Sequence, residues 1–174
     1  MIETQIETTT QTTLLATFFV RDALCALDAS GVQEVIRVDS VTRVRHAPDE
    51  VAGVINLRGK IVTLLDLAFI LGFGKSTVTR ESRIFIVEDR NEFLGILVDR
   101  VSEVIEINSG EGESLPVNIP SAQARFFQGV CRAAGQVIAI LNPGEVMNEA
   151  RATADRSASL ADRPEQRAKE GTWK

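Results

Sequence analysis

The sequence contains one pattern twice, and this repeat constrains the fold more than any other feature. Residues 101–105 read VSEVI and match residues 32–36, VQEVI, at four of five positions. Each of these segments follows a pair of β-prone runs and precedes a stretch typical of a glycine-containing hairpin. We therefore predict two related halves, about residues 14–71 and 84–147, each with about five short strands.

Each half is smaller than the size at which a hydrophobic core is comfortably stable by itself. The two halves should therefore pack into one body, in which strands can be exchanged between them. Short strands joined by polar turns are typical of small antiparallel barrels. The predicted fold is all-β and consists of two small barrels that share one core.

The stretch at residues 53–67, GVINLRGKIVTLLDL, indicates a hairpin with Arg58 at its tip. Gly59 can take the positive φ that a tight turn requires. The second arm shows no strict alternation of polar and apolar residues, so we expect both of its faces to be covered. In the second half, Gly135 repeats the turn glycine, whereas Ala134 stands in place of Arg58. Arg58 is therefore a candidate for function rather than for folding.

Glu34 is a weaker candidate when taken alone, because Glu103 occupies the same position in the second half. If Glu34 lies near Arg58, the two side chains can form an ion pair. An exposed pair contributes only about 0–1 kcal/mol to stability. Such a pair would orient the guanidinium more than it would stabilise the fold.

Composition argues against several classes of function. The net charge of −5 argues against nucleic acid as a partner, because phosphate contacts need clustered cations. No apolar run approaches the roughly 18 residues of a membrane span, and the N-terminus has no secretory signal, so we expect a cytoplasmic protein without direct membrane insertion. Cys25 and Cys131, with a single histidine, do not form a metal site, and we expect both in the core without a disulfide.

Residues 72–77, GFGKST, are the main alternative from another class of function, a small nucleotide-binding protein. The Walker pattern needs a glycine where Phe69 stands, and it needs a helix after the loop, whereas residues 77–79 are β-prone. No nucleophile, base and orienting group can be combined from the sequence. We therefore predict neither an enzyme nor a cofactor.

Three segments resemble the CheW family, the coupling proteins of bacterial chemotaxis. They are VQEVIRV, VTRVRHAPDEVAGVINLRGKIVTLLDL and LGILVDRVSEVI, and the resemblance runs from about Leu14 to Met147. It implies two intertwined, five-stranded barrels similar to SH3 domains, with one or two short helices. It also implies a cytoplasmic, non-catalytic adaptor that couples the cytoplasmic tips of methyl-accepting chemoreceptors to the regulatory domain of the histidine kinase CheA. A coupling protein of a chemotaxis-like pathway controlling surface motility is the alternative within the family.

The resemblance also implies a partner-binding site. It contains the hairpin turn, the Glu34 position and apolar or small positions along a groove between the two barrels. The implied residues are Val32, Glu34, Val35, Asn56, Leu57, Arg58, Gly59, Gly95 and Val101. The chain departs from the family pattern at Thr63, where proline is common, at Arg100, where glycine is usual, and over residues 108–126.

The two ends of the chain differ from the central part, residues 14–147, in composition. Residues 1–13 are rich in threonine, and we expect a disordered tail there. Residues 148–174 form a polar tail that we expect to be partly helical or disordered, with a frayed helix at residues 150–160 that Pro164 would end. Trp173 in this tail has no counterpart in the family.

Overall fold

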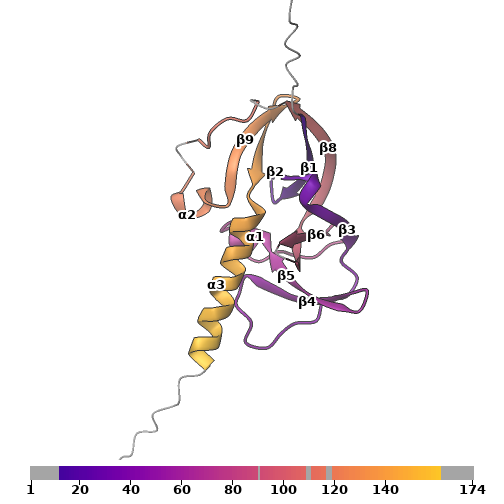
Figure 1. Cartoon of the computed structure of the whole chain (residues 1–174), viewed down its shortest axis with the longest axis vertical. Coiled ribbons are helices and arrows are strands. Elements are labelled where there is room, and N and C mark those ends of the chain that lie inside the picture. The colour runs from indigo at the N-terminus through magenta and orange to yellow at the C-terminus, as the bar shows by residue number, and fades with distance from the viewer. Residues whose placement is uncertain (1–11, 90, 109–110, 117–118, 162–174) are drawn as a thin grey trace, which may run out of the picture.

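The computed structural model describes residues 12–89, 91–108, 111–116 and 119–161 (Figure 1). The elements of the first half are β1 (Thr12–Val20), β2 (Ala23–Asp28), the short 3-10 helix η1 (Ala29–Gly31), β3 (Val32–Arg37), β4 (Val51–Leu57), β5 (Lys60–Asp66) and α1 (Leu67–Ile70). The elements of the second half are β6 (Arg83–Asp89), β7 (Glu92–Val98), β8 (Arg100–Asn108), α2 (Ser121–Ala124), β9 (Phe127–Ala133), β10 (Gln136–Leu141) and α3 (Pro143–Ala161).

Each of the two sheets combines strands from both halves. One sheet has the order β8-β1-β2-β10-β9 and the other has the order β3-β6-β7-β5-β4. When the strands of each half are numbered from one to five, both sheets have the same order: third, first, second, fifth, fourth. The third, fourth and fifth strands of each half therefore join the first two strands of the other half. The prediction of two intertwined five-stranded units is confirmed, and Figure 1 shows β8 beside β1, with β9 in the same sheet.

The repeated glycines at the start of the two hairpins have a structural cause. A Cβ atom on Gly53 would lie 2.5 Å from the carbonyl oxygen of Thr42, and one on Gly129 would lie 2.8 Å from that of Glu113. Thr42 forms an isolated bridge to β4, and Glu113 forms the equivalent bridge to β9. Since β4 and β9 are the last strands of their sheets, each glycine allows a loop to cover a sheet edge. Glu113 lies in the segment at residues 108–126, which departs from the family pattern, and this segment still forms the bridge to the edge strand.

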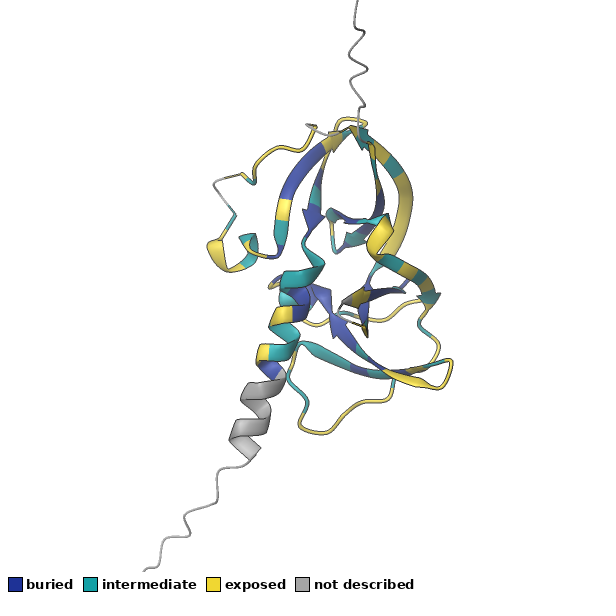
Figure 2. Ribbon diagram, in the orientation of Figure 1, coloured by how far each residue is buried: buried dark blue, intermediate teal, exposed yellow. Residues whose placement is uncertain are grey.

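The largest hydrophobic cluster lies between the two sheets. At its centre the rings of Phe18 on β1 and Phe85 on β6 have centroids 5.0 Å apart, and both side chains are fully buried. Two smaller clusters occupy the insides of the two barrels. Figure 2 shows the buried residues on the strands around this junction and on the first turns of α3. The shared central cluster fits the expectation that neither half is stable alone.

Helix α3 is the largest difference from the prediction, because it begins at Pro143 instead of near residue 150. A proline is well suited to the first turn of a helix, where its missing N–H is not needed. Val146 and Met147 anchor this turn in the cluster between the sheets. In the described residues, no helix has the length and hydropathy of a membrane span. Pro164, Trp173 and residues 1–11 lie outside the described residues, and β1 begins at Thr12.

Both cysteines should be unreactive in the folded protein. Cys25 and Cys131 are buried and free, as predicted. Burial raises the pKa of the Cys25 thiol to about 12, and the pKa of Cys131 is raised by burial and then by the carboxylate of Glu111. At pH 8 roughly one Cys25 side chain in ten thousand is then the reactive thiolate. We expect iodoacetamide at pH 8 to label neither cysteine in the native state and both in guanidinium chloride, measured by intact mass. Rapid native labelling would contradict this burial.

Candidate partner-binding site

Arg58 lies at the tip of the hairpin formed by β4 and β5. Leu57 pairs with Lys60, so the turn consists of Arg58 and Gly59 alone. Their φ angles are +52° and +84°, the combination typical of a type I′ turn. The side-chain oxygen of Asn56 accepts a hydrogen bond of 2.8 Å from the Gly59 N–H and closes the turn. The positive φ of Gly59 was predicted, but that of Arg58 was not.

The structure brings Glu34 close to Arg58, and the guanidinium of Arg58 forms an ion pair with it. Its Nη2 lies 3.1 Å from Oε2 of Glu34, and the Arg58 side chain remains 79% exposed. Beside this pair is a hollow of about 210 Å³, lined also by Gln33, Leu57, Lys60 and Phe93. Nζ of Lys60 lies 4.7 Å from the centroid of the Phe93 ring, within the range of a cation–π contact. The hairpin tip therefore presents two cations, one carboxylate and an apolar floor.

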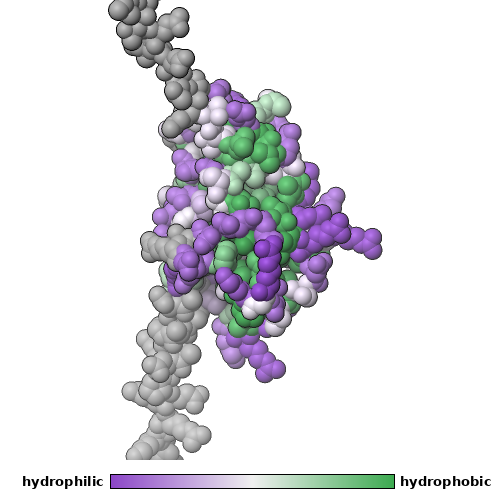
Figure 3. All heavy atoms as spheres, turned by 45° about the vertical axis from the view of Figure 1, so that its right-hand side comes forward, coloured by the Kyte–Doolittle hydropathy of each residue, from purple (hydrophilic) through white to green (hydrophobic). Residues whose placement is uncertain are grey.

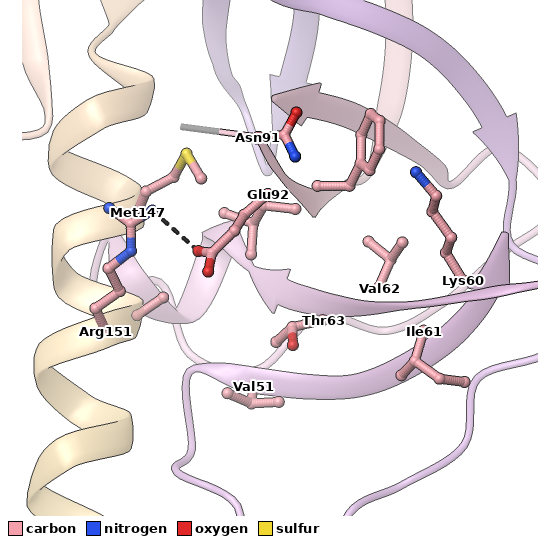
Figure 4. Close-up of a pocket in the computed structure, with 12 residues that line it drawn as sticks. Val51, Lys60, Ile61, Val62, Thr63, Asn91, Glu92, Met147 and Arg151 are labelled. Atoms are coloured by element: carbon pink, nitrogen blue, oxygen red, sulfur yellow. Dashed lines mark hydrogen bonds and ion pairs between the residues drawn. The ribbon is translucent and has the colours of Figure 1, made fainter. Parts of the chain in front are cut away.

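A larger cleft of about 490 Å³ adjoins the hairpin tip and lies between β5, the start of β7 and α3 (Figure 4). Lys60 and Phe93 line both hollows. Ile61 also lines the cleft and is 71% exposed, so the prediction that both faces of this arm are covered was wrong here. Helix α3 covers the outer face of β5 only further along the strand, where Leu65 packs in the same cluster as Met147. Ile61 is thus a candidate contact residue that local patterning missed.

The wall of this cleft on the α3 side is held by an ion pair. Nη2 of Arg151 lies 3.1 Å from Oε2 of Glu92 at the start of β7 (Figure 4). This contact joins the helix to the second sheet, 59 residues away in the sequence. The cleft is therefore formed by elements from distant parts of the sequence, and only the tertiary structure determines their proximity.

The predicted valines lie at the junction of the two sheets. Val35 on β3 is paired with Phe85, and Val101 on β8 is paired with Phe18. Because the two phenylalanine rings are in contact, the two valines lie on either side of one aromatic pair. They are 43% and 38% exposed, and Val104 on β8 is 60% exposed. We call Val35, Val101 and Val104 the seam valines.

Val104 was missed, although the repeat could have identified it as the counterpart of Val35. The seam valines lie on β8 and β3, which are end strands of the two sheets. The edge of each of these strands is open on the side away from its neighbour, β1 or β6. Figure 3 shows hydrophobic atoms in a band down the middle of this face, with hydrophilic side chains on both sides. Exposed apolar surface is often found at interaction sites, so the seam valines are a candidate for partner binding.

The predicted site residues therefore form three groups. Those at the hairpin tip are Glu34, Asn56, Leu57, Arg58 and Gly59. Val35 and Val101 lie at the junction, whereas Val32 packs against the central cluster and Gly95 is buried in β7. A Cβ atom on Gly95 would lie 3.0 Å from Cγ2 of Ile84, so this glycine allows close packing inside the barrel.

Residues 72–77 form a connector that is anchored to the second sheet. The carboxylate of Asp66 is buried and accepts hydrogen bonds of 2.7 Å from both the N–H and the hydroxyl of Ser76. Nζ of Lys75 lies 2.6 Å from Oδ1 of Asp49. No helix follows this segment before β6, among residues that the structure describes throughout this region. This geometry differs from that of a phosphate-binding loop, in which a helix follows the glycine-rich turn.

Comparisons with known proteins agree with the fold and the motifs. The family model of the CheW-like domain matches residues 15–151. The chain is 29% identical to the Chemotaxis protein CheW of Treponema pallidum over 134 residues, which are 74% of this chain and 78% of the relative. It is 27% identical to Protein FrzA of Myxococcus xanthus over 136 residues, which are 77% and 84% of the two chains.

A solved structure supports the same relationship. The scaffolding protein TtCheW from Thermoanaerobacter tengcongensis has a TM-score of 0.70 and 32% sequence identity to this chain. The match covers 76% of this chain and 85% of that protein. At this coverage and TM-score, the two chains share one fold.

Proposed function

The chain belongs to the family of CheW-like domains, whose members are non-catalytic coupling and scaffolding proteins, and on this basis we propose the following function. The protein is a cytoplasmic adaptor that couples the tips of chemoreceptors to the histidine kinase CheA. An adaptor must hold two partners at once, so it needs two separate surfaces. The hairpin tip and the seam valines support this requirement.

The observation that carries the proposal is the division of β3 between these two surfaces. Glu34 and Val35 are neighbours on this strand, and adjacent residues of a strand point to opposite faces. Glu34 pairs with Arg58 at the hairpin tip, whereas Val35 pairs with Phe85 at the junction. A partner on one face therefore leaves the other face accessible.

The chemistry of each surface suggests which partner it holds. The seam valines form a narrow apolar surface that fits one face of an amphipathic helix, as a receptor tip would present. The hairpin tip carries charges and the adjoining cleft adds the exposed Ile61, a combination that fits the end of a related barrel in the kinase regulatory domain. Each contact is modest in area, so assembly of many copies would supply the avidity.

Replacing Val35 with serine tests this assignment. Losing the methyl groups that the bound helix would cover should weaken binding of a chemoreceptor tip fragment about tenfold, while binding of the kinase regulatory domain stays unchanged. Isothermal titration calorimetry with each purified partner measures both. Val137→Ser is the matched control, because Val137 is 48% exposed on β10 and belongs to neither surface. Equal weakening for both partners, or none, would contradict the division into two surfaces.

The alternative within the family is a coupling protein for a pathway that controls surface motility. The likeness to Protein FrzA favours it. Capture of partners from the source cell with the tagged full chain, followed by mass spectrometry, separates the two. The receptors and the kinase that are recovered identify the pathway, and recovery of neither class would contradict the adaptor function itself.

A further inference from the structure

Two arginines face each other directly beside the seam valines. Arg37 on β3 and Arg83 on β6 are cross-strand partners, two positions along from the pair formed by Val35 and Phe85. Residues i and i+2 of a strand point to the same face. Both arginines therefore lie on the face of the sheet that carries Val35. Like charges directly opposite each other in a sheet are destabilising.

Among the described residues, no carboxylate forms an ion pair with either arginine to offset the repulsion between their charges. Neither Arg37 nor Arg83 forms an ion pair there, although several other arginines do. Nη1 of Arg83 donates hydrogen bonds of 2.8 Å to the carbonyl oxygens of Arg80 and Ser82, which hold its guanidinium in place. Arg37 is exposed. Since the chain has 24 acidic and 19 basic residues, the composition does not force this arrangement.

We propose that Arg37 and Arg83 form a carboxylate-binding end of the seam-valine surface, so that the docked receptor helix carries an Asp or Glu there. This inference rests on the proposed function and specifies the chemistry of its partner. Two strand residues span roughly 7 Å, and one turn of an α-helix spans about 5.4 Å. A carboxylate one turn from the apolar residue that covers Val35 can therefore reach the arginines.

The arrangement suits this task because part of it is already ordered. The carbonyl contacts of Arg83 fix one guanidinium before the partner arrives, so less side-chain entropy is lost on binding. A carboxylate between two guanidinium groups also removes their mutual repulsion. The bound state thus gains charge-assisted hydrogen bonds and loses an unfavourable contact.

Replacing Arg37 with glutamine tests the inference. We expect the variant to keep or slightly raise its melting temperature, because the repulsion is relieved, and to bind a chemoreceptor tip fragment about tenfold more weakly at low salt. The difference in affinity between the variant and the wild type should shrink in 0.5 M salt, because salt screens the attraction between exposed charges. Arg37→Glu should weaken binding further. Arg45→Gln is the matched control, since Arg45 is an exposed arginine outside both surfaces and its loss changes the net charge equally.

The outcomes separate this inference from the proposed function. If the wild-type protein fails to bind the receptor fragment, the proposed function is wrong and the inference falls with it. If the wild type binds and Arg37→Gln binds equally well, or no more weakly than Arg45→Gln, only the inference is overturned. A lower melting temperature for Arg37→Gln with unchanged binding would assign Arg37 a structural role and would also overturn it.

Discussion

Replacing Arg58 with asparagine should leave the stability of the fold unchanged or slightly raised and should weaken partner binding at least tenfold. The φ of Arg58 is +52°, a conformation that asparagine adopts more readily than arginine, and Asn-Gly is a favoured sequence for this turn. The lost ion pair with Glu34 is exposed and contributes only about 0–1 kcal/mol. The guanidinium, in contrast, is a solvent-exposed group of the kind that supplies much of the energy of an interface.

The second half of the chain provides the control for this variant. Ala134 and Gly135 form the equivalent turn, with φ angles of +49° and +77°. Ala134→Asn therefore makes the same improvement in turn sequence without touching the hairpin tip. We expect both variants to match or exceed the wild type in thermal unfolding, and only Arg58→Asn to lose affinity for the kinase regulatory domain in calorimetry. Wild-type affinity in Arg58→Asn would remove the role proposed for Arg58.

Replacing Gly53 or Gly129 with alanine should each cost about 3 kcal/mol of the free energy of unfolding. A Cβ atom on Gly53 would lie 2.5 Å from the carbonyl oxygen of Thr42, at a φ of +150° that alanine rarely adopts. That carbonyl cannot easily move, because it accepts a 2.8 Å hydrogen bond from the N–H of Val54. At Gly129 the contact is 2.8 Å to the Glu113 carbonyl, which is held by an equivalent bond.

Urea unfolding followed by circular dichroism measures this cost. Gly31→Ala is the matched control, since a Cβ atom there has no neighbour within 4 Å, and its effect should stay within about 0.5 kcal/mol. Comparable losses at Gly53 and Gly129 are expected because the two loops cover equivalent sheet edges. A stability equal to that of Gly31→Ala would show that the loop bridges contribute little.

Several features of the site were predictable because they depend on local sequence. The hairpin around Arg58 and Gly59 follows from two β-prone runs and a turn glycine. The pairing of Arg58 with Glu34 was predicted only on the condition that the two residues lie close together, and the tertiary structure meets that condition. The exposure of Ile61 was not predicted, because it depends on where α3 crosses β5. The helix begins at Pro143, seven residues before the start predicted from the polar tail.

The sequence by itself determined the number of strands in each half, the positions of the turns and the need for the halves to share a core. These properties follow from hydrophobic patterning and glycine placement, which act over a few residues. Only the tertiary structure decided that β3 lies beside β6 and β8 beside β1. That choice places Val35 and Val101 around the Phe18–Phe85 pair and sets Arg37 opposite Arg83. Pairing between distant strands is decided by burial of the whole core, because backbone hydrogen bonds are the same for any partner strand.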